Sequence, residues 1–199
     1  MTDTASRPGL DAQGFIGREG SLARVPPVFR PVVASAREEL TAAFGARLNG
    51  AYLYGSVPRG TARVGRSDLD LLVSLHGEPT AADRDATRAL EERLDARFPQ
   101  IDGVGTLLHS RERLLSERER YDLGWFVSCL CTPLYGEDLA GLLPRHRPGS
   151  LLARETNGDL ALLLPAGGSA SPPPTAPRRP GGRSSASCPA TSYAPASPS

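Results

Sequence analysis

The chain has 199 residues, enough for one domain of ordinary size with additional segments. Its formal net charge of +1 provides no overall field that would favour a nucleic acid or a membrane surface as partner. All 23 basic residues are arginine, which excludes a Walker-type phosphate loop and a Schiff-base lysine mechanism. Arginine is therefore the only side-chain cation available to hold phosphate groups.

The N-terminal residues 1–25 carry Gly, Ser, Thr and Arg without periodicity, and we predict a flexible arm there. They lack the apolar core of a secretory signal, and no apolar run reaches the roughly 18 residues of a membrane helix. Cys129 and Cys131 lie in an apolar stretch without a partner His/Cys cluster, which favours buried, reduced thiols over a zinc site. We therefore expect a cytoplasmic protein.

The periodicity of apolar residues predicts an alternation of helices and strands from residue 30 onwards. A small mixed β-sheet with helices packed on one side, an α/β (α+β) arrangement, is the expected fold. The expected helices are 30–47, 80–98 with Thr80 as its cap, and 112–132, and the expected strands are 50–55, 69–75 and 101–109. Residues 133–139 are expected to form a turn into another short helix.

The most informative motif lies between the first two predicted strands. An apolar run ends in Gly55-Ser56, a loop rich in Gly and Arg follows, and Asp68-Leu69-Asp70 opens the next apolar run twelve positions after Ser56. Residues i and i+2 of a strand point to the same side, so the two carboxylates aim at one point. Such a pair is costly unless a cation lies between the charges, and Mg²⁺ commonly takes one or two carboxylates plus substrate phosphates.

Gly55 allows the backbone to approach a phosphate closely, and Ser56 offers both an N–H and a hydroxyl. The motif therefore predicts a metal–nucleotide site. An Asx-rich turn that joins two ordinary strands is the alternative interpretation.

These residues resemble the DNA polymerase beta-type nucleotidyltransferases. That family has a Gly-Ser turn, a variable loop with a further glycine and an Asp-x-Asp strand, and Gly55-Ser56, Gly60 and residues 67–73 keep this order. The resemblance covers roughly residues 25–165 and includes the run Leu-Tyr-Gly-Glu-Asp at 134–138. It implies the nucleotidyltransferase fold, similar to small bacterial members of the aminoglycoside or minimal type, with residues 26–147 as the core.

The resemblance also implies roles for the motif residues. Asp68 and Asp70 would hold two Mg²⁺ ions about 4 Å apart, and Gly55 and Ser56 would bind the terminal phosphates of ATP or another NTP. The loop arginines are available to neutralise the triphosphate, with an ordinary surface role as the alternative: Arg59, Arg63 and Arg66.

The family uses a third carboxylate on a later strand, both as metal ligand and to help deprotonate the acceptor hydroxyl. Asp102, at the start of the third predicted strand, is the candidate for this catalytic and metal-binding role. The alternative interpretation is a turn, because Asp102-Gly103 is a strong turn dipeptide.

The composition changes after Pro165. Residues 148–165 begin what resembles the helical C-terminal region of relatives, whereas 166–199 contain no Asp, Glu, Leu, Ile, Val or Phe. Such a segment cannot bury enough apolar surface to offset its ordering entropy, which predicts a disordered tail. A truncated or frame-shifted relative and a natural disordered tail both remain open.

By resemblance, the expected function is the metal-dependent transfer of a nucleoside monophosphate, AMP from ATP by default, onto a hydroxyl of a small molecule or protein, with release of pyrophosphate. No nucleic-acid partner and no membrane are expected, and the sequence leaves the oligomeric state open. The alternative is an inactive nucleotide-binding or protein-interaction module of an antitoxin-like kind.

Overall fold

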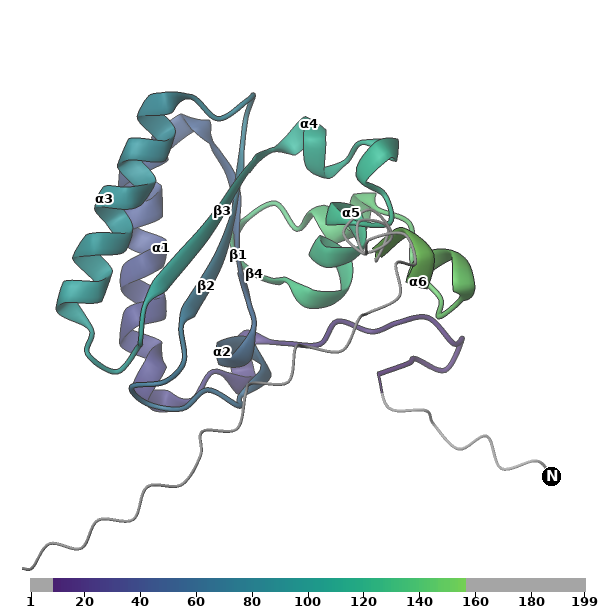
Figure 1. The fold of residues 1–199 in the computed structure, drawn as a ribbon, viewed down its shortest axis with the longest axis horizontal. Coiled ribbons are helices and arrows are strands. Elements are labelled where there is room, and N and C mark those ends of the chain that lie inside the picture. Colours follow the sequence, from purple (N-terminus) through teal and green to yellow (C-terminus); the bar gives the residue numbers. More distant parts are fainter. Residues whose placement is uncertain (1–8, 157–199) are drawn as a thin grey trace, which may run out of the picture. The chain divides into compact units, whose positions relative to one another are not determined.

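The computed structural model describes residues 9–156 of the chain (Figure 1). These residues belong to a single compact unit. The predicted tail at 166–199 and most of the predicted C-terminal region at 148–165 lie outside the described residues. None of the helices between residues 9 and 156 has the length and apolarity needed to cross a lipid bilayer.

A four-stranded mixed sheet forms the centre of the fold, which confirms the predicted fold class. Its strands are β1 (Leu48–Tyr54), β2 (Leu69–Leu75), β3 (Val104–Ser110) and β4 (Thr132–Gly136), arranged in the order β3-β2-β1-β4. β1 runs antiparallel to both β2 and β4, whereas β2 and β3 are parallel. The antiparallel β1–β2 pair places the end of β1 beside the start of β2.

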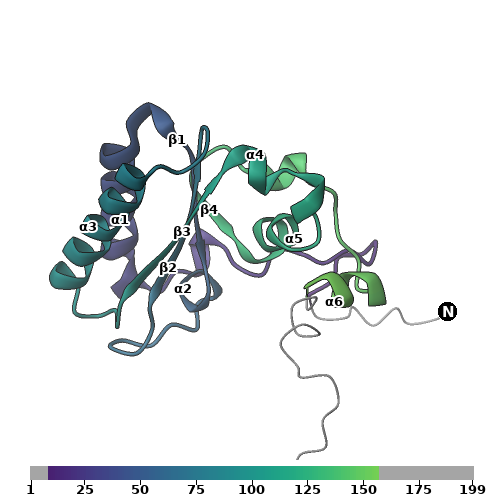
Figure 2. The same ribbon diagram turned by 45° about the horizontal axis from the view of Figure 1, so that its top comes forward.

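Two long helices cover one face of this sheet, as both views show (Figures 1 and 2). They are α1 (Arg30–Phe44) and α3 (Ala81–Arg97), and they contribute the buried side chains Val32, Leu40, Leu90 and Leu94. Alternate residues of β2 are buried in the same cluster: Leu69, Leu71 and Val73. The intervening residues of β2 consequently face the other side of the sheet.

Short helical segments pack on the opposite face, where the sequence predicted one helix over 112–132. That prediction is wrong in detail: the stretch divides into α4 (Arg111–Leu114), the 3-10 turn Glu117–Glu119, α5 (Leu123–Trp125) and the π-helical turn Phe126–Leu130. A second apolar cluster explains the division, because it draws side chains from several segments onto the sheet: Tyr52, Leu72, Leu114, Val127, Cys131 and Leu139. Tertiary burial here overrides the local helical pattern.

The expected turn over 133–139 is also wrong, because its first half is strand β4. Pro133 lies on an edge strand, where the missing N–H costs no hydrogen bond of the sheet. Gly136 closes the strand with a φ of 75°, and a Cβ at this position would collide with the carbonyl oxygen of Asn49. The short helical turn Leu139–Leu142 follows, and α6 (Ser150–Thr156) is the last helix described.

The described part of the predicted N-terminal arm, residues 9–25, makes specific contacts with the rest of the unit. The Glu19 N–H donates to the carbonyl of Cys129 at 2.8 Å, and the Ser21 N–H donates to that of Pro58 at 3.0 Å. Arg18 pairs with Asp138 at 2.8 Å. This segment therefore joins the β4 side of the sheet to the turn after β1.

Candidate functional site

The turn after β1 brings the backbone close to a carboxylate of β2. Gly55 ends the strand with φ 74° and ψ −149°, a conformation that side-chain-bearing residues rarely adopt. A Cβ on Gly55 would also collide with Oδ2 of Asp70. The short helix α2 (Ser56–Arg59) follows at once and is anchored by buried Val57 and Pro58. The turn therefore needs glycine for its backbone and for the space that Asp70 occupies.

Asp68 and Asp70 lie at the start of β2 and flank the buried Leu69. Asp70 is half-buried, whereas Asp68 is exposed to solvent. Burial, and then the neighbouring charge of Asp68, raise the pKa of Asp70, while the Arg59 guanidinium opposes this rise. The two predicted carboxylates are thus close enough to repel each other, which is the electrostatic condition that a bound cation relieves.

Among the predicted phosphate-binding arginines, Arg59 is the one whose charge acts on Asp70. Its Nε donates to the carbonyl oxygen of Gly55 at 2.9 Å, and its Nη1 pairs with Glu19 Oε1 at 3.0 Å. Both groups of this ion pair are more than 40% exposed, so solvent screens the pair and the guanidinium can exchange partners. Arg63 and Arg66 are exposed in the loop that connects α2 to β2.

Asp102, the predicted third carboxylate, lies in a bend before β3 rather than on the strand. It is exposed, and its N–H donates to the carbonyl of Ser67 at 3.1 Å. The strand starts at Val104 because Asp102-Gly103 forms the turn that the dipeptide also allowed. Between residues 9 and 156 no three His, Cys, Asp or Glu side chains are grouped so that they could hold a metal ion. The structure brings Asp68 and Asp70 together and does not bring Asp102 to them as a third member.

Two further residues adjoin Asp70 on neighbouring strands, and the sequence analysis missed both. Tyr54 of β1 is directly opposite Asp70, and burial followed by the charge of Asp70 raises the pKa of Tyr54 to about 12. Its ring meets that of Phe126 edge-to-face, with 4.9 Å between the centroids. Gly105 of β3 is the partner of Asp70 in the parallel register, and a Cβ there would meet no atom within 4 Å. Tyr54 was detectable as the last residue before the Gly-Ser turn, whereas Gly105 depends on a register that no local pattern encodes.

The donor set fits a hard divalent cation that shares its coordination with a ligand. Two adjacent carboxylates supply oxygen atoms, one of them half-buried with its pKa raised by burial and its neighbour. Mg²⁺ is commonly bound by one or two carboxylates, with water and substrate phosphates as the remaining ligands. Asp68 and Asp70 are the residues that would hold such an ion.

Residues 34–125 match the family model described as "Nucleotidyltransferase domain". A crystal structure of a toxin-antitoxin with AMP-PNP is similar at 18% identity, with a TM-score of 0.36 over 64% of this chain and 88% of that chain. A crystal structure of the toxin-antitoxin MntA-HepT is similar at 15% identity, with a TM-score of 0.32 over 64% of this chain and 86% of that chain. None of the curated proteins matches the chain.

Proposed function

We propose, from the match of residues 34–125 to the nucleotidyltransferase domain model, that the chain transfers AMP from ATP to a hydroxyl group of a small molecule or protein. The observation that carries the proposal is the pair Asp68 and Asp70 beside the glycine turn at Gly55. In this reaction the acceptor oxygen forms a bond to the α-phosphorus of ATP. The bond from that phosphorus to the bridging oxygen breaks, pyrophosphate leaves, and the hydroxyl proton passes to solvent.

We assign the roles as follows. Asp68 and Asp70 hold Mg²⁺, and Gly55 and Ser56 bind the terminal phosphates through their backbone and the serine hydroxyl. A bound Mg²⁺ would neutralise charge on the phosphates and act as a Lewis acid. Arg59 lies beside Asp70 and is the arginine best placed to leave its exposed ion pair with Glu19 for a phosphate oxygen. Arg66 and Asp102 keep their predicted roles in phosphate binding and acceptor activation as part of this proposal.

The site supports a second function, nucleotide binding without transfer. Gly105 occupies the position of β3 beside Asp70, and no three metal-binding side chains gather within residues 9–156. A pair of carboxylates suffices to bind a metal–nucleotide complex, but it leaves the acceptor hydroxyl without a neighbouring base on β3. The chain would then act as an inactive nucleotide-binding or interaction module.

Calorimetric titration of Mg–ATP into the full chain tests the proposed site. We expect saturable binding that requires Mg²⁺ and is lost in the Asp68→Asn/Asp70→Asn double variant. Asp85→Asn is the matched control, because Asp85 is an exposed carboxylate on α3 that pairs with Arg88. Metal-independent binding, or equal binding by the double variant, would contradict the assignment of these carboxylates.

Transfer is then distinguished from binding alone with ATP labelled at the α-phosphate. If the chain is a transferase, the label appears on a protein or small molecule of a cell extract and pyrophosphate is released in step. A chain that binds Mg–ATP tightly but releases no pyrophosphate with any fraction of the extract is the inactive module.

A further inference from the structure

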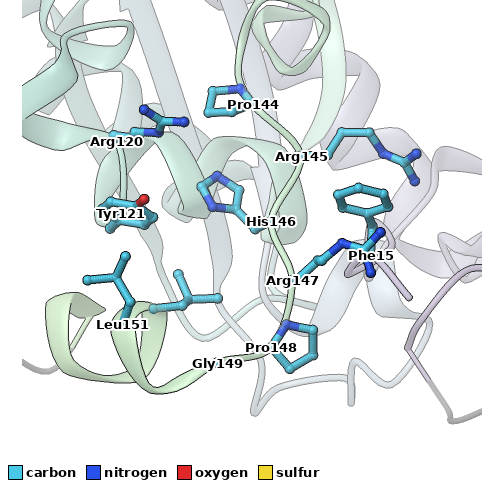
Figure 3. A pocket seen from close by; sticks show the side chains of 11 residues that line it. Phe15, Arg120, Tyr121, Pro144, Arg145, His146, Arg147, Pro148, Gly149 and Leu151 are labelled. Atoms are coloured by element: carbon cyan, nitrogen blue, oxygen red, sulfur yellow. The ribbon is translucent and has the colours of Figure 1, made fainter. Parts of the chain in front are cut away.

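A cavity of about 320 Å³ lies away from the Asp68 and Asp70 pair, between the N-terminal segment around Phe15 and the start of α6 (Figure 3). Three arginines line it, and none of its lining residues is an aspartate or glutamate: Arg120, Arg145 and Arg147 provide the cations. Its apolar wall includes Tyr121 and two leucines of α6, Leu151 and Leu152. The size is at the lower end of the range for small-molecule sites.

His146 lies in the middle of this cavity and has an unsatisfied nitrogen. The residue is 5% exposed, and its Nε2 is buried without a hydrogen-bond partner among the described residues. The ring meets Tyr121 edge-to-face with centroids 6.0 Å apart, and it lies between Tyr121 and Arg145 (Figure 3). A buried polar atom without a partner costs free energy, so His146 is a polar residue of the cavity lining whose Nε2 no atom of the described residues satisfies.

Arg120, which also lines the cavity, has a second buried nitrogen atom without a hydrogen-bond partner among the described residues. Its Nε is buried and has no partner within residues 9–156, while its Nη1 pairs with Glu117 at 3.2 Å. Its guanidinium carbon lies 5.6 Å from the centroid of the Tyr121 ring. The cavity therefore has two buried nitrogen atoms, one on Arg120 and one on His146, that no side chain of the described region satisfies.

The remaining two cations are fixed by Phe15. Arg145 and Arg147 stack on its ring with guanidinium carbons 4.2 and 4.1 Å from the centroid. Arg145 also pairs with Asp11, whereas no carboxylate in the described region lies within ion-pair distance of Arg147. Stacking holds both guanidinium groups in place at little further entropic cost, and Arg147 leaves one positive charge uncompensated at the rim.

We propose that this cavity is a second binding site that takes a small organic phosphate monoester. Guanidinium groups bind phosphate through two parallel N–H donors, and Arg147 offers such a fork without breaking an ion pair. His146 and Arg120 line the same cavity and add two further nitrogen-bearing side chains to its polar part. Tyr121, Leu151 and Leu152 cover the apolar body of the ligand. None of these residues belongs to the Asp68 and Asp70 site, so the two sites are separate.

Titration calorimetry with phenyl phosphate as the probe tests this proposal on the full chain in the presence of EDTA. We expect saturable binding, with inorganic phosphate weaker because it lacks the apolar body and benzyl alcohol not bound because it lacks the charge. Arg147→Gln should weaken phenyl phosphate binding by roughly tenfold or more, since a hydrogen bond to a charged group is lost. Arg37→Gln is the matched control, because Arg37 is an exposed arginine on α1 that does not line the cavity.

His146→Phe provides the second variant, which keeps a ring in the cavity and removes its nitrogen atoms. We expect His146→Phe to bind phenyl phosphate more weakly and still to unfold cooperatively on heating. The Asp68→Asn/Asp70→Asn variant should bind phenyl phosphate as the wild type does. Equal binding by wild type and Arg147→Gln, equal binding of benzyl alcohol, or no saturable binding at millimolar concentrations would overturn the proposal. A dependence on Mg²⁺ and on Asp68 would instead place the probe at the nucleotide site and would also overturn it.

Discussion

The negative charge of Asp70 would bind a cation, but without a cation the same charge destabilises the folded protein. Burial and Asp68 raise its pKa in the folded state. The folded protein therefore binds this proton more readily than the unfolded chain, and stability is lost as the pH rises from the unfolded value of 3.8 through the folded pKa. At pH 7 Asp70→Asn should consequently increase the free energy of unfolding in urea when no metal is present.

The same substitution should have the opposite effect when the ligand is present. Mg–ATP should stabilise the wild type and leave Asp70→Asn unchanged, so the two stability curves cross as ligand is added. Below about pH 3.8 the advantage of the variant without metal should disappear, since wild-type Asp70 is then protonated in both states. A variant that is destabilised at neutral pH without metal would show that Asp70 is a structural rather than a ligand-binding carboxylate.

Gly105 leaves the β3 position beside Asp70 without a side chain. It is the β3 partner of Asp70, and there is open space where its Cβ would be. Gly105→Asp should therefore place a third carboxylate on the same face and tighten the binding of Mn²⁺ on the order of tenfold, because affinity rises with the charge of the ligand set. Without metal the variant should be less stable than the wild type, since three like charges then repel one another.

Gly105→Asn is the matched control for this experiment, as it adds the same volume without the charge. It should leave the affinity for Mn²⁺, measured by titration calorimetry, close to that of the wild type. If Gly105→Asp binds Mn²⁺ no more tightly than the wild type does, the side chain at this position does not face the carboxylate pair.

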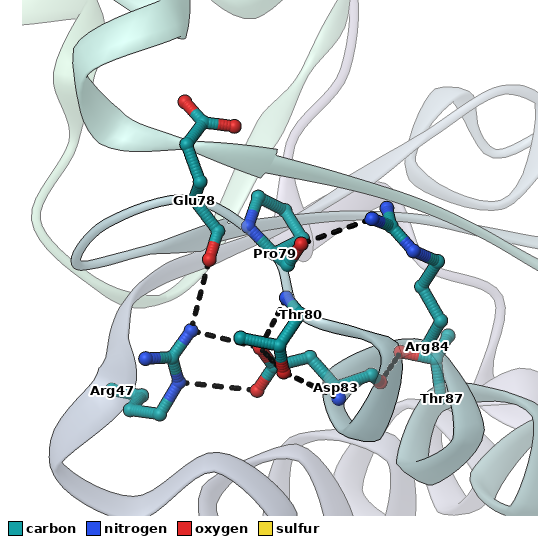
Figure 4. Close-up of polar contacts among 7 residues, drawn as sticks. All are labelled: Arg47, Glu78, Pro79, Thr80, Asp83, Arg84 and Thr87. Atoms are coloured by element: carbon teal, nitrogen blue, oxygen red, sulfur yellow. Dashed lines mark hydrogen bonds and ion pairs between the residues drawn. The ribbon is translucent and has the colours of Figure 1, made fainter.

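At the scale of elements, the start of α3 is fixed by a reciprocal cap (Figure 4). Thr80 accepts the Asp83 N–H at 3.2 Å, and the Asp83 carboxylate accepts the Thr80 N–H at 2.7 Å. Arg47 pairs with the same carboxylate at 2.8 Å and ties the helix to the start of β1. Burial alone would raise the pKa of Asp83, but the hydrogen bonds from Thr80 and Arg47 outweigh it and hold that pKa below its usual range.

Thr80→Ala removes one half of this cap. It should lower the free energy of unfolding by about 0.5–2 kcal/mol, measured by urea denaturation at pH 7. Thr41→Ala is the control, because Thr41 is within α1 and its hydroxyl donates to the carbonyl of Arg37. A loss no larger than that of Thr41→Ala would show that Arg47 and Asp83 suffice to fix the end of the helix.

Elements with local signals could be predicted from the sequence, and those fixed by distant contacts could not. Strand 69–75 was predicted with the bounds of β2, and helix 80–98 with the cap at Thr80, since period and capping residues are local. β4 was missed because Pro133 indicates a turn unless the strand lies at a sheet edge, a fact of topology. The candidate site divides in the same way: Asp-x-Asp is a local pattern, whereas the neighbours Tyr54 and Gly105 follow from strand pairing.

On the scale of the whole molecule, the sheet separates two apolar clusters, and the two proposed sites belong to different parts of the unit. The nucleotide site is built on the ends of β1 and β2, with Asp70 beside Tyr54, which packs against the second of these clusters. The second cavity is built on residues 120–121 and 144–152 with Phe15. No lining residue is shared, so the binding free energies at the two sites should add.

A thermal unfolding experiment with both ligands tests this independence. Mg–ATP at a hundredfold excess over its dissociation constant should stabilise the chain by about 2.7 kcal/mol. For a protein of this size that corresponds to a rise in Tm of several degrees, at roughly 2–4 °C per kcal/mol. Phenyl phosphate at a comparable excess should raise the Tm by a further amount, and Arg147→Gln should remove only the rise that phenyl phosphate causes. A combined shift in Tm that clearly exceeds or falls short of the sum of the two separate shifts would mean that the two sites are coupled. The segment at residues 16–21 would then carry the coupling, because it is hydrogen-bonded to both Cys129 and Pro58.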